Sequence, residues 1–320
     1  MPTTLMLYSV VSDLQNPLLT GVGQTIATRD DTFQFLDTLS IGDSIQHKYN
    51  RELSLGATPA AFVAPGTAVY ASPATSYPVT DNILEAIAAV QVPKVFNDPT
   101  QVAYQIGSKV KDIRRTFGNS FINGQAGSDI AGLKWITTTA PTTQTGSSGQ
   151  VVSASGSSWA ALTLGMLDAL VRKVSVLNMP TFLVANRVVI DQYRNLLRVS
   201  AGGLAGNQIQ LKTLGGEDRT YLTVQGVPMI ASDWISLSES GTGVDMANGS
   251  GSSVYAVYSN SIDGLHLFYS TNPGSPIVNV DGPKPIAGVN AVGYDVTFNV
   301  GMSCKSTFAV ARLQGVQVAF

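Results

Sequence analysis

The sequence has little charge. Only 12% of its 320 residues are Asp, Glu, Lys or Arg, against roughly 25% in soluble domains. Because a monomer stays in solution largely through its charge, a charge-poor surface indicates a protein whose faces are covered by copies of itself. A secreted β-rich protein, which is also poor in Lys and Glu, is the alternative at this point.

The sequence also lacks an excess of positive charge. Its formal net charge is −2 and its isoelectric point is about 5.6. Without an overall basic field, sequence-specific nucleic-acid binding is not expected, so nucleic acid near this chain would be contained rather than read. Hydrophobic residues make up 44% of the chain, enough for a sizeable core.

Cysteine pairs and membrane segments are missing as well. The single cysteine, Cys304, excludes an intrachain disulfide and a cysteine metal site. It lies in an alternating apolar pattern, which predicts a buried thiol. No run of 18 apolar residues is present, and the first residues have no signal-peptide pattern. We therefore expect no membrane span and a protein made and used in a cytoplasm.

Catalytic motifs are absent too. His47 and His266 lie far apart in the sequence, each in a strand-like alternation, which favours packed or surface histidines. There is no HExxH zinc motif, nucleophile elbow or phosphate-binding glycine loop. The only adjacent carboxylates, Asp30-Asp31 and Glu217-Asp218, lie in expected loops. We expect no enzyme activity, no cofactor and no metal.

The first half of the chain predicts extended material around one long helix. Residues 1–40 hold two weak amphipathic stretches, at 9–26 and 32–39, that need a partner surface. Residues 43–80 alternate as a strand and then carry a Pro65-Gly66 turn, which predicts a long hairpin with little core of its own. Such loops are usually functional or interfacial.

A helix is expected over 99–122. Asp98 fits the N-cap, Pro99 fits the first helical position and Gly124 supplies the stop. One apolar stripe runs along it: Val102, Ile106, Val110, Ile113, Phe117 and Phe121. Its other side carries the densest basic cluster of the sequence: Lys109, Lys111, Arg114 and Arg115. These residues are either a solvated face or a row that pairs with an acidic neighbouring subunit.

The second half predicts an α+β module. An uncharged linker at 137–158 marks a boundary. Helices at about 164–174 and 187–199 flank a short buried strand at 181–185, and a glycine-rich loop follows at 201–219. Strands are then expected at 221–224, 227–231, 254–259, 265–270, 277–280, 294–302 and 308–310.

Several stretches, in this order, resemble the major capsid protein of tailed bacteriophages, whose fold encapsulin nanocompartments share. The segment YNREL at 49–53 resembles the start of the extended E-loop. KVKDIRRTFGNSFING at 109–124, followed by Ala131-Gly132-Leu133, resembles the end of the spine helix and its turn. PTFLVANRVVIDQYRNLLRVSAG at 180–202 and TVQGVPMIASDWI at 223–235 resemble the strand, helix and hairpin of the axial domain.

The resemblance implies a domain layout and an assembly function. The layout is an N-terminal arm at 1–40, an E-loop at 41–80, a P-domain at 81–136, an A-domain at 137–285 and returning strands at 286–320. The implied function is self-assembly as pentamers and hexamers into an icosahedral shell around packaged double-stranded DNA. Scaffold, portal and decoration or cement proteins are implied partners. The implied location is the virion capsid, assembled in the bacterial host cytoplasm.

The resemblance also implies positions for subunit contacts. These are Lys48, Arg51 and Glu52 at the E-loop base, and Lys109, Arg114 and Arg115 on the spine helix. The 201–219 loop, with Lys212, Glu217, Asp218 and Arg219, is expected at a symmetry axis. We expect no N-terminal scaffolding segment, no maturation cleavage and no covalent cross-link at Lys48. The alternatives are an encapsulin-type shell around enzyme cargo or a β-rich secreted hydrolase or binding protein.

Overall fold

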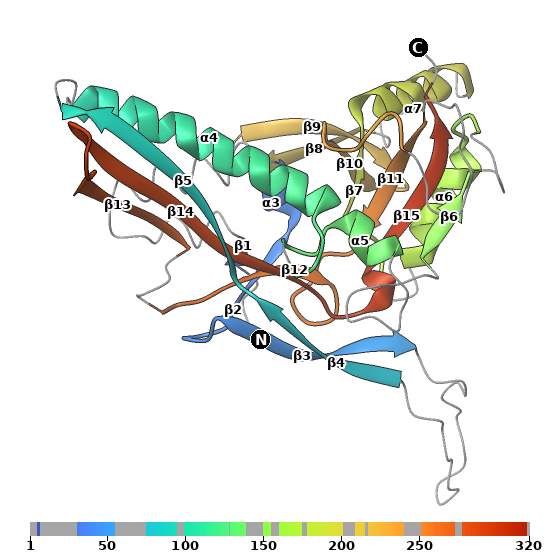
Figure 1. Cartoon of the computed structure of the whole chain (residues 1–320). Coiled ribbons are helices and arrows are strands. Elements are labelled where there is room, and N and C mark those ends of the chain that lie inside the picture. Colours follow the sequence, from blue (N-terminus) through green and yellow to red (C-terminus); the bar gives the residue numbers. More distant parts are fainter. Residues whose placement is uncertain are drawn as a thin grey trace, which may run out of the picture.

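The computed structural model describes most of the chain. The described residues are 5–6, 31–54, 75–94, 99–127, 129–138, 150–154, 160–174, 178–200, 209–214, 217–239, 251–272 and 277–318. The predicted amphipathic stretch at 9–26, the Pro65-Gly66 turn and Asp98 lie outside these ranges. Two main sheets form the body, and a separate two-stranded sheet projects from it (Figure 1).

The first sheet is built around one long strand. Its order is β1-β2-β12-β14-β13, with β5 also paired to β14. Its strands are β1 (Leu5–Met6), β2 (Asp37–Ser40), β5 (Leu84–Pro93), β12 (Leu265–Tyr269), β13 (Val278–Pro285) and β14 (Ala291–Cys304). Gly301 of β14 lies opposite Phe268 of β12, whose ring leaves no space for a side chain there. This contact fixes the register of the two strands.

Helix α4 (Pro99–Asn123) lies along β5 and β14 (Figure 1). The predicted helix at 99–122 is thus confirmed, and all but one residue of its stripe are buried, the N-terminal Val102 being only half-buried. The stripe packs against the inward-facing residues of β5 and β14 in one hydrophobic core. Packing compensates for Gly107 and Gly118 within the helix.

The second sheet has seven strands in the order β6-β15-β11-β7-β10-β9-β8. Its strands are β6 (Val151–Ser153), β7 (Phe182–Ala185), β8 (Ile209–Leu214), β9 (Glu217–Val224), β10 (Val227–Ala231), β11 (Gly251–Val257) and β15 (Val310–Gln317). Helices α6 (Leu164–Val174) and α7 (Arg187–Ser200) share a core with one face of its central strands. The other face joins the core around α4 and α5 (Leu133–Thr138).

Three expectations need correction. The helix predicted over 32–39 is only α3 (Asp31–Phe35), because β2 then pairs in parallel with β12. The loop predicted at 201–219 contains β8 and the first residues of β9, which form an antiparallel hairpin. Strand β5 was not predicted at all, although it makes ten residue pairs with β14.

The last strands also divide differently from the expected layout. β12 and β13, assigned to the A-domain segment, lie in the first sheet with β5 and β14. The C-terminal strand β15, which follows the short 3-10 helix η3 (Thr307–Ala309), lies in the second sheet between β6 and β11. The chain therefore crosses from one sheet to the other between Cys304 and Val310.

Candidate functional site

The projecting two-stranded sheet confirms the predicted hairpin at 43–80. β3 (Gln46–Ser54) and β4 (Thr75–Asn82) pair antiparallel from Gln46↔Asn82 to Ser54↔Thr75. Figure 1 shows this pair extending below the body, away from both main sheets. Neither strand pairs with another strand among the described residues. An isolated hairpin is marginal in water, so its base must be anchored by the body.

A polar cluster provides this anchor. The Tyr49 hydroxyl donates a hydrogen bond to Asp81 Oδ2 at 2.8 Å, and its distance to the Cys304 carbonyl oxygen is 3.3 Å. Burial raises the pKa of Asp81 above its usual range, and the bond from Tyr49 opposes that shift. Burial, followed by the charge of Asp81, also raises the pKa of Tyr49. The cluster joins both hairpin strands to the end of β14.

Arg51 belongs to this buried base and not to the surface. Its side chain is 1% exposed, and Nη2 lies 3.9 Å from the sulfur of Cys304. The expectation that Arg51 contacts a neighbouring subunit is therefore corrected: β4 and the end of β14 cover it within its own chain. Cys304 is a buried thiol as predicted; it donates to the Ser306 carbonyl, and burial raises its pKa.

The two histidines meet beside this cluster. Their ring centroids lie 5.5 Å apart, and His47 also stacks on Tyr49 and packs against Phe268. Burial, helped by the positive charge of Lys305, lowers the pKa of His47 to about 4 and that of His266 to about 3. Both rings are therefore neutral at pH 7. The sequence predicts a packed or surface position for each histidine but carries no sign that they meet.

Two other hairpin residues are candidates for subunit contacts, Lys48 and Glu52. Lys48 is exposed on β3. Glu52 lies opposite Ser76 in the register of the hairpin. Lys48 lies between His47 and Tyr49 at the base of the hairpin, and Glu52 lies further along β3. Both stay candidates for contacts with another molecule.

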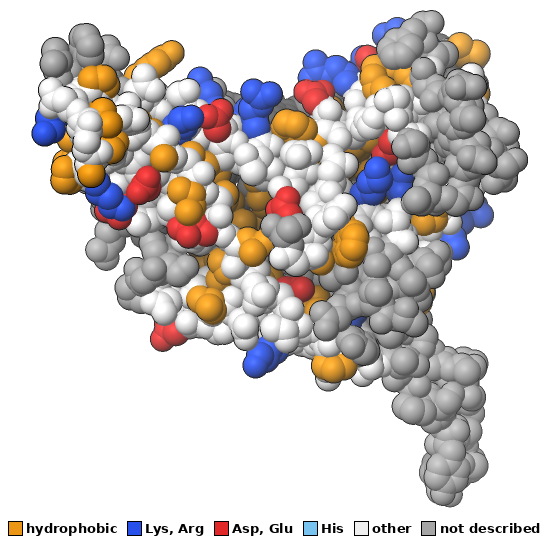
Figure 2. Space-filling view, in the orientation of Figure 1, with side chains coloured by type: hydrophobic (Ala, Val, Ile, Leu, Met, Phe, Trp, Pro, Cys, Tyr) orange, Lys and Arg blue, Asp and Glu red, His pale blue; other side chains and the backbone are white. Residues whose placement is uncertain are grey.

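The candidates on α4 lie on its flanks, with Lys109 and Arg114, and on its outward side, with Arg115. Lys109 pairs with Asp112 one turn later, at 3.2 Å. Arg114 is half-buried and Arg115 is exposed. Figure 2 shows Lys and Arg side chains gathered over this helix, with an acidic group among them.

The candidates expected at a symmetry axis lie on the β8–β9 hairpin. Lys212 is opposite Arg219, and the loop joining the two strands separates Leu214 from Glu217. β8 is an edge strand of the second sheet. The four predicted residues are thus brought together on one hairpin, rather than spread along a loop.

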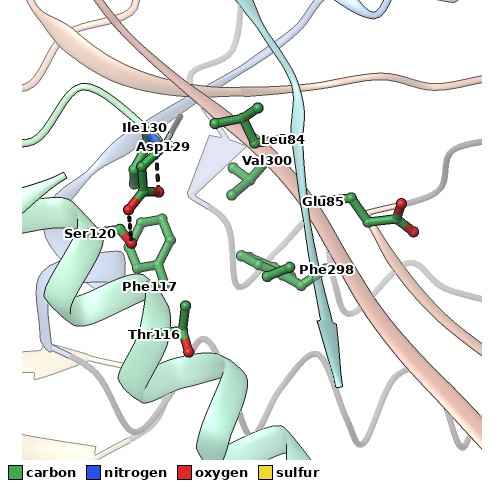
Figure 3. Close-up of a pocket in the computed structure, with 10 residues that line it drawn as sticks. Leu84, Glu85, Thr116, Phe117, Ser120, Asp129, Ile130, Phe298 and Val300 are labelled. Carbon is green, nitrogen blue, oxygen red and sulfur yellow. Dashed lines mark hydrogen bonds between the residues drawn. The ribbon is translucent and has the colours of Figure 1, made fainter. Parts of the chain in front are cut away.

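A cavity of 180 Å³ lies between α4, β5 and β14 (Figure 3). Its walls are mostly apolar. The Ser120 hydroxyl donates to Asp129 Oδ2 at 2.6 Å, while the other Asp129 oxygen accepts from the Ile130 backbone N–H. Figure 3 shows the Glu85 carboxylate directed away from Asp129. Asp129 therefore holds the turn after α4, and the cavity has no pair of facing carboxylates.

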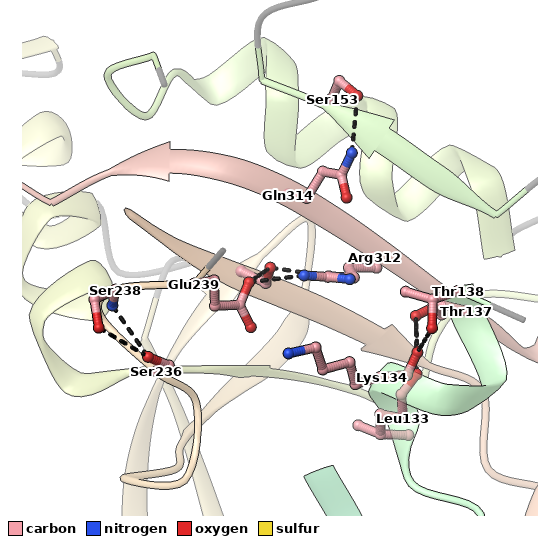
Figure 4. A network of polar contacts seen from close by, with 11 residues as sticks. Leu133, Lys134, Thr137, Thr138, Ser153, Ser236, Ser238, Glu239, Arg312 and Gln314 are labelled. Carbon is pink, nitrogen blue, oxygen red and sulfur yellow. Dashed lines mark hydrogen bonds and ion pairs between the residues drawn. The ribbon is translucent and has the colours of Figure 1, made fainter. Parts of the chain in front are cut away.

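Among the described residues, the most buried ion pair joins the second sheet to the segment after β10 (Figure 4). Arg312 Nη2 lies 2.8 Å from Glu239 Oε2, and Arg312 Nε donates to the Ser253 hydroxyl at 3.0 Å. Ser253 also donates to Glu239. Arg312 and Glu239 are 3% and 6% exposed. The contacts tie residues 232–239 to β11 and β15.

The described residues contain neither a metal site nor a membrane-spanning helix. No group of three or more His, Cys, Asp and Glu residues in these ranges is arranged to hold a metal ion. No helix within them is long and apolar enough to cross a membrane.

Comparison with known proteins gives the fold. Neither a protein-family model nor a curated protein matches the sequence. Among solved structures, an encapsulin of Synechococcus elongatus PCC 7942 matches with a TM-score of 0.64 and 19% identity, covering 92% of this chain and 90% of its own. The capsid of an empty GTA particle matches with a TM-score of 0.58 and 13% identity, covering 91% and 90%. The capsid of cyanophage P-SCSP1u matches with a TM-score of 0.54 and 14% identity, covering 91% of this chain and 89% of its own.

These likenesses extend over almost the whole of both chains. The chain therefore has the α+β fold that phage capsid proteins and encapsulins share, as the sequence resemblance predicted.

Proposed function

We propose that this chain is the major capsid protein of a tailed bacteriophage, which assembles as pentamers and hexamers into an icosahedral shell around double-stranded DNA. The observation that carries the proposal is the match to shell proteins over about 90% of both chains. The domain layout of arm, E-loop, P-domain and A-domain, the absence of enzyme activity and the location in a virion are part of the same proposal. Separate scaffold, portal and decoration proteins are its expected partners.

The shape of the subunit supports this function. The β3–β4 hairpin leaves the body and has unpaired strand edges among the described residues, a form that gains stability when it lies on another molecule. Beside α7, a groove of 390 Å³ is lined by Leu162, Leu196 and the 85% exposed Val199. Apolar surface of this kind is typical of subunit contacts.

Several charged residues are proposed for these contacts. Lys48 and Glu52 lie on the hairpin, and Lys109 and Arg114 lie on the flanks of α4. The β8–β9 hairpin, with Lys212, Glu217, Asp218 and Arg219, is proposed to approach a symmetry axis. Arg51 is no longer included, because it is buried within its own subunit.

Negative-stain electron microscopy of the expressed chain tests the proposal. Closed shells are expected from the wild type, with or without a co-expressed scaffold. Lys48→Glu and Arg114→Glu should yield folded subunits that fail to close shells, while Arg187→Glu, on the exposed start of α7, serves as a matched charge-reversal control. A stable monomer that never forms particles under any of these conditions would contradict the proposal.

An encapsulin-type compartment around enzyme cargo is the second candidate, favoured by the TM-score of 0.64 to the Synechococcus encapsulin. The contents of particles purified from the native source distinguish the two. Nuclease-protected DNA supports the capsid, whereas a single enclosed enzyme supports the encapsulin.

A further inference from the structure

The outward side of α4 carries a second stripe, opposite the apolar one. Four buried positions of the helix follow the spacing 4, 3, 4: Ile106, Val110, Ile113 and Phe117. The residues two positions before each of them repeat that spacing about 200° around the helix: Tyr104, Ser108, Lys111 and Arg115. All four are exposed, and Tyr104 is 72% exposed. We call Tyr104, Lys111 and Arg115 the α4 ridge.

The ridge has positive charge that its surroundings do not neutralise. Residues 109–115 contain four cations and one anion, a net charge of +3 in a chain whose net charge is −2. The single anion, Asp112, is already paired with Lys109. Within the described part of the chain, Lys111 and Arg115 form no ion pair with any carboxylate. The charge is therefore available to a partner.

We propose that the α4 ridge binds the sugar–phosphate backbone of nucleic acid without reading its sequence. The proposal rests on the proposed function, in which the shell encloses DNA, and it identifies the surface of the subunit that touches the contents. The α4 ridge then faces the interior of the shell.

Charge spacing and composition favour a phosphate backbone over an acidic neighbour. Lys111 and Arg115 are separated by about 6 Å along the helix axis, and each strand of DNA presents one phosphate per roughly 3.4 Å of axis. A second copy of this chain offers no acidic run to match, since its only adjacent carboxylates are Asp30-Asp31 and Glu217-Asp218. Tyr104 is an exposed aromatic ring at the N-terminal end of the ridge, about 10 Å from Lys111 along the helix axis, and such rings are typical of surfaces on which unpaired bases stack.

Fluorescence anisotropy with the unassembled full chain tests the ridge directly. The probes are a 20-base-pair duplex of arbitrary sequence and a single strand of the same length, titrated over a range of KCl concentrations. Lys111→Gln with Arg115→Gln should weaken binding to the duplex at least tenfold at low salt. It should also reduce the slope of log K against log salt by about two, since each phosphate contact contributes roughly 0.9. Tyr104→Ala should weaken binding to the single strand more than to the duplex.

The matched control is Arg187→Gln with Arg198→Gln. It removes the same charge from exposed positions on α7, and its binding should stay within twofold of the wild type. Equal loss in the two double variants would overturn the proposal, because it would reflect overall charge alone. Unchanged affinity and slope in the ridge variant would overturn it as well.

Shell assembly separates this inference from the proposed function. If the wild type forms no shells, the proposed function fails, whereas the anisotropy experiment still tests the ridge. The ridge variant is expected to form shells that retain less nuclease-protected nucleic acid per subunit. A variant that binds the probes normally and fails to assemble would place the ridge at a subunit contact and overturn the inference.

Discussion

Two buried polar clusters hold the molecule together in different ways. Beneath the second sheet, Arg312 and Glu239 form a charged pair whose side chains are 4% and 5% exposed. At the base of the β3–β4 hairpin, His47 and His266 are neutral rings, and the carboxylate of Asp81 accepts from Tyr49. The first cluster closes a connection within the body. The second fastens a projecting element to it.

The two clusters differ in how much free energy it costs to separate their groups. Separating a buried ion pair leaves an uncompensated charge in a medium of low polarity. Separating the hairpin from the body breaks the ring contacts of His47 and the contact of Tyr49 with the Cys304 carbonyl, and Arg51 and the other groups released can be hydrated. We therefore expect the hairpin to come away from the body under conditions that leave the second sheet intact. Such an asymmetry would suit the proposed function, in which the hairpin lies on a neighbouring subunit.

The largest expected effect comes from Glu239→Ala. It leaves the Arg312 guanidinium buried without its carboxylate, so the free energy of unfolding should fall by about 3–5 kcal/mol. Urea denaturation of the unassembled chain at pH 7 measures this. Ser236→Ala, at an exposed position of the same segment, is the control and should change stability by less than about 0.5 kcal/mol. If Glu239→Ala lowers the free energy of unfolding by less than about 1 kcal/mol, the Arg312–Glu239 pair is no stronger a link than the hairpin base.

The second effect is a loss of hairpin attachment in acid. The pKa of His266 is about 3 in the folded chain, against an ordinary value of 6.5, so the unfolded chain binds more protons between these values. Stability is therefore complete above about pH 6.5 and falls as the pH drops, by about 1.4 kcal/mol per pH unit from this fully buried histidine. Lys305 and His47 oppose its charge. Asp263 is a counter-charge to Lys305, and Asp81 lies opposite His47 in the hairpin.

Hydrogen exchange as a function of pH measures where this loss occurs. At pH 4.5 the amides of β3 and β4 should lose protection relative to those of β11 and β15, after correction for intrinsic exchange. His266→Gln should flatten the pH dependence of the hairpin. Equal loosening of both regions in acid would show that the histidines do not control the attachment.

A smaller change is expected for Tyr49→Phe. It removes the hydroxyl that donates to Asp81 and should lower the free energy of unfolding by about 1.5 kcal/mol, as for a hydrogen bond to a charged group. Tyr104→Phe removes a hydroxyl from an exposed side chain and serves as the control. If both substitutions have the same effect, the Tyr49 hydroxyl, which bonds Asp81 across the hairpin and lies 3.3 Å from the Cys304 carbonyl oxygen, does not stabilise the hairpin base.

The two regions also differ in what the sequence reveals. Helix α4 was predictable because its start, its stripe and its stop are local signals. Strand β5 was missed because small residues such as Ala86 and Ala88 give weak alternation, and its partner β14 lies about 200 residues later. The hairpin base was missed for the same reason: His47 and His266 are brought together only by tertiary structure. Arg51 looked like a surface cation because no local pattern shows that β4 and β14 will cover it.

The smallest expected effect tests whether burial, rather than charge alone, makes the Arg312–Glu239 pair strong. Lys109 and Asp112 form an ion pair of ordinary length, 3.2 Å, but their side chains are 38% and 54% exposed. Water screens such a pair, so a double-mutant cycle with Lys109→Ala and Asp112→Ala should give a coupling of only about 0.3–0.5 kcal/mol, further reduced in 1 M salt. A cycle with Arg312→Ala and Glu239→Ala should give a coupling free energy several times larger, which depends little on salt. Equal couplings in the two cycles would mean that the buried surroundings of the Arg312 pair contribute nothing to its strength.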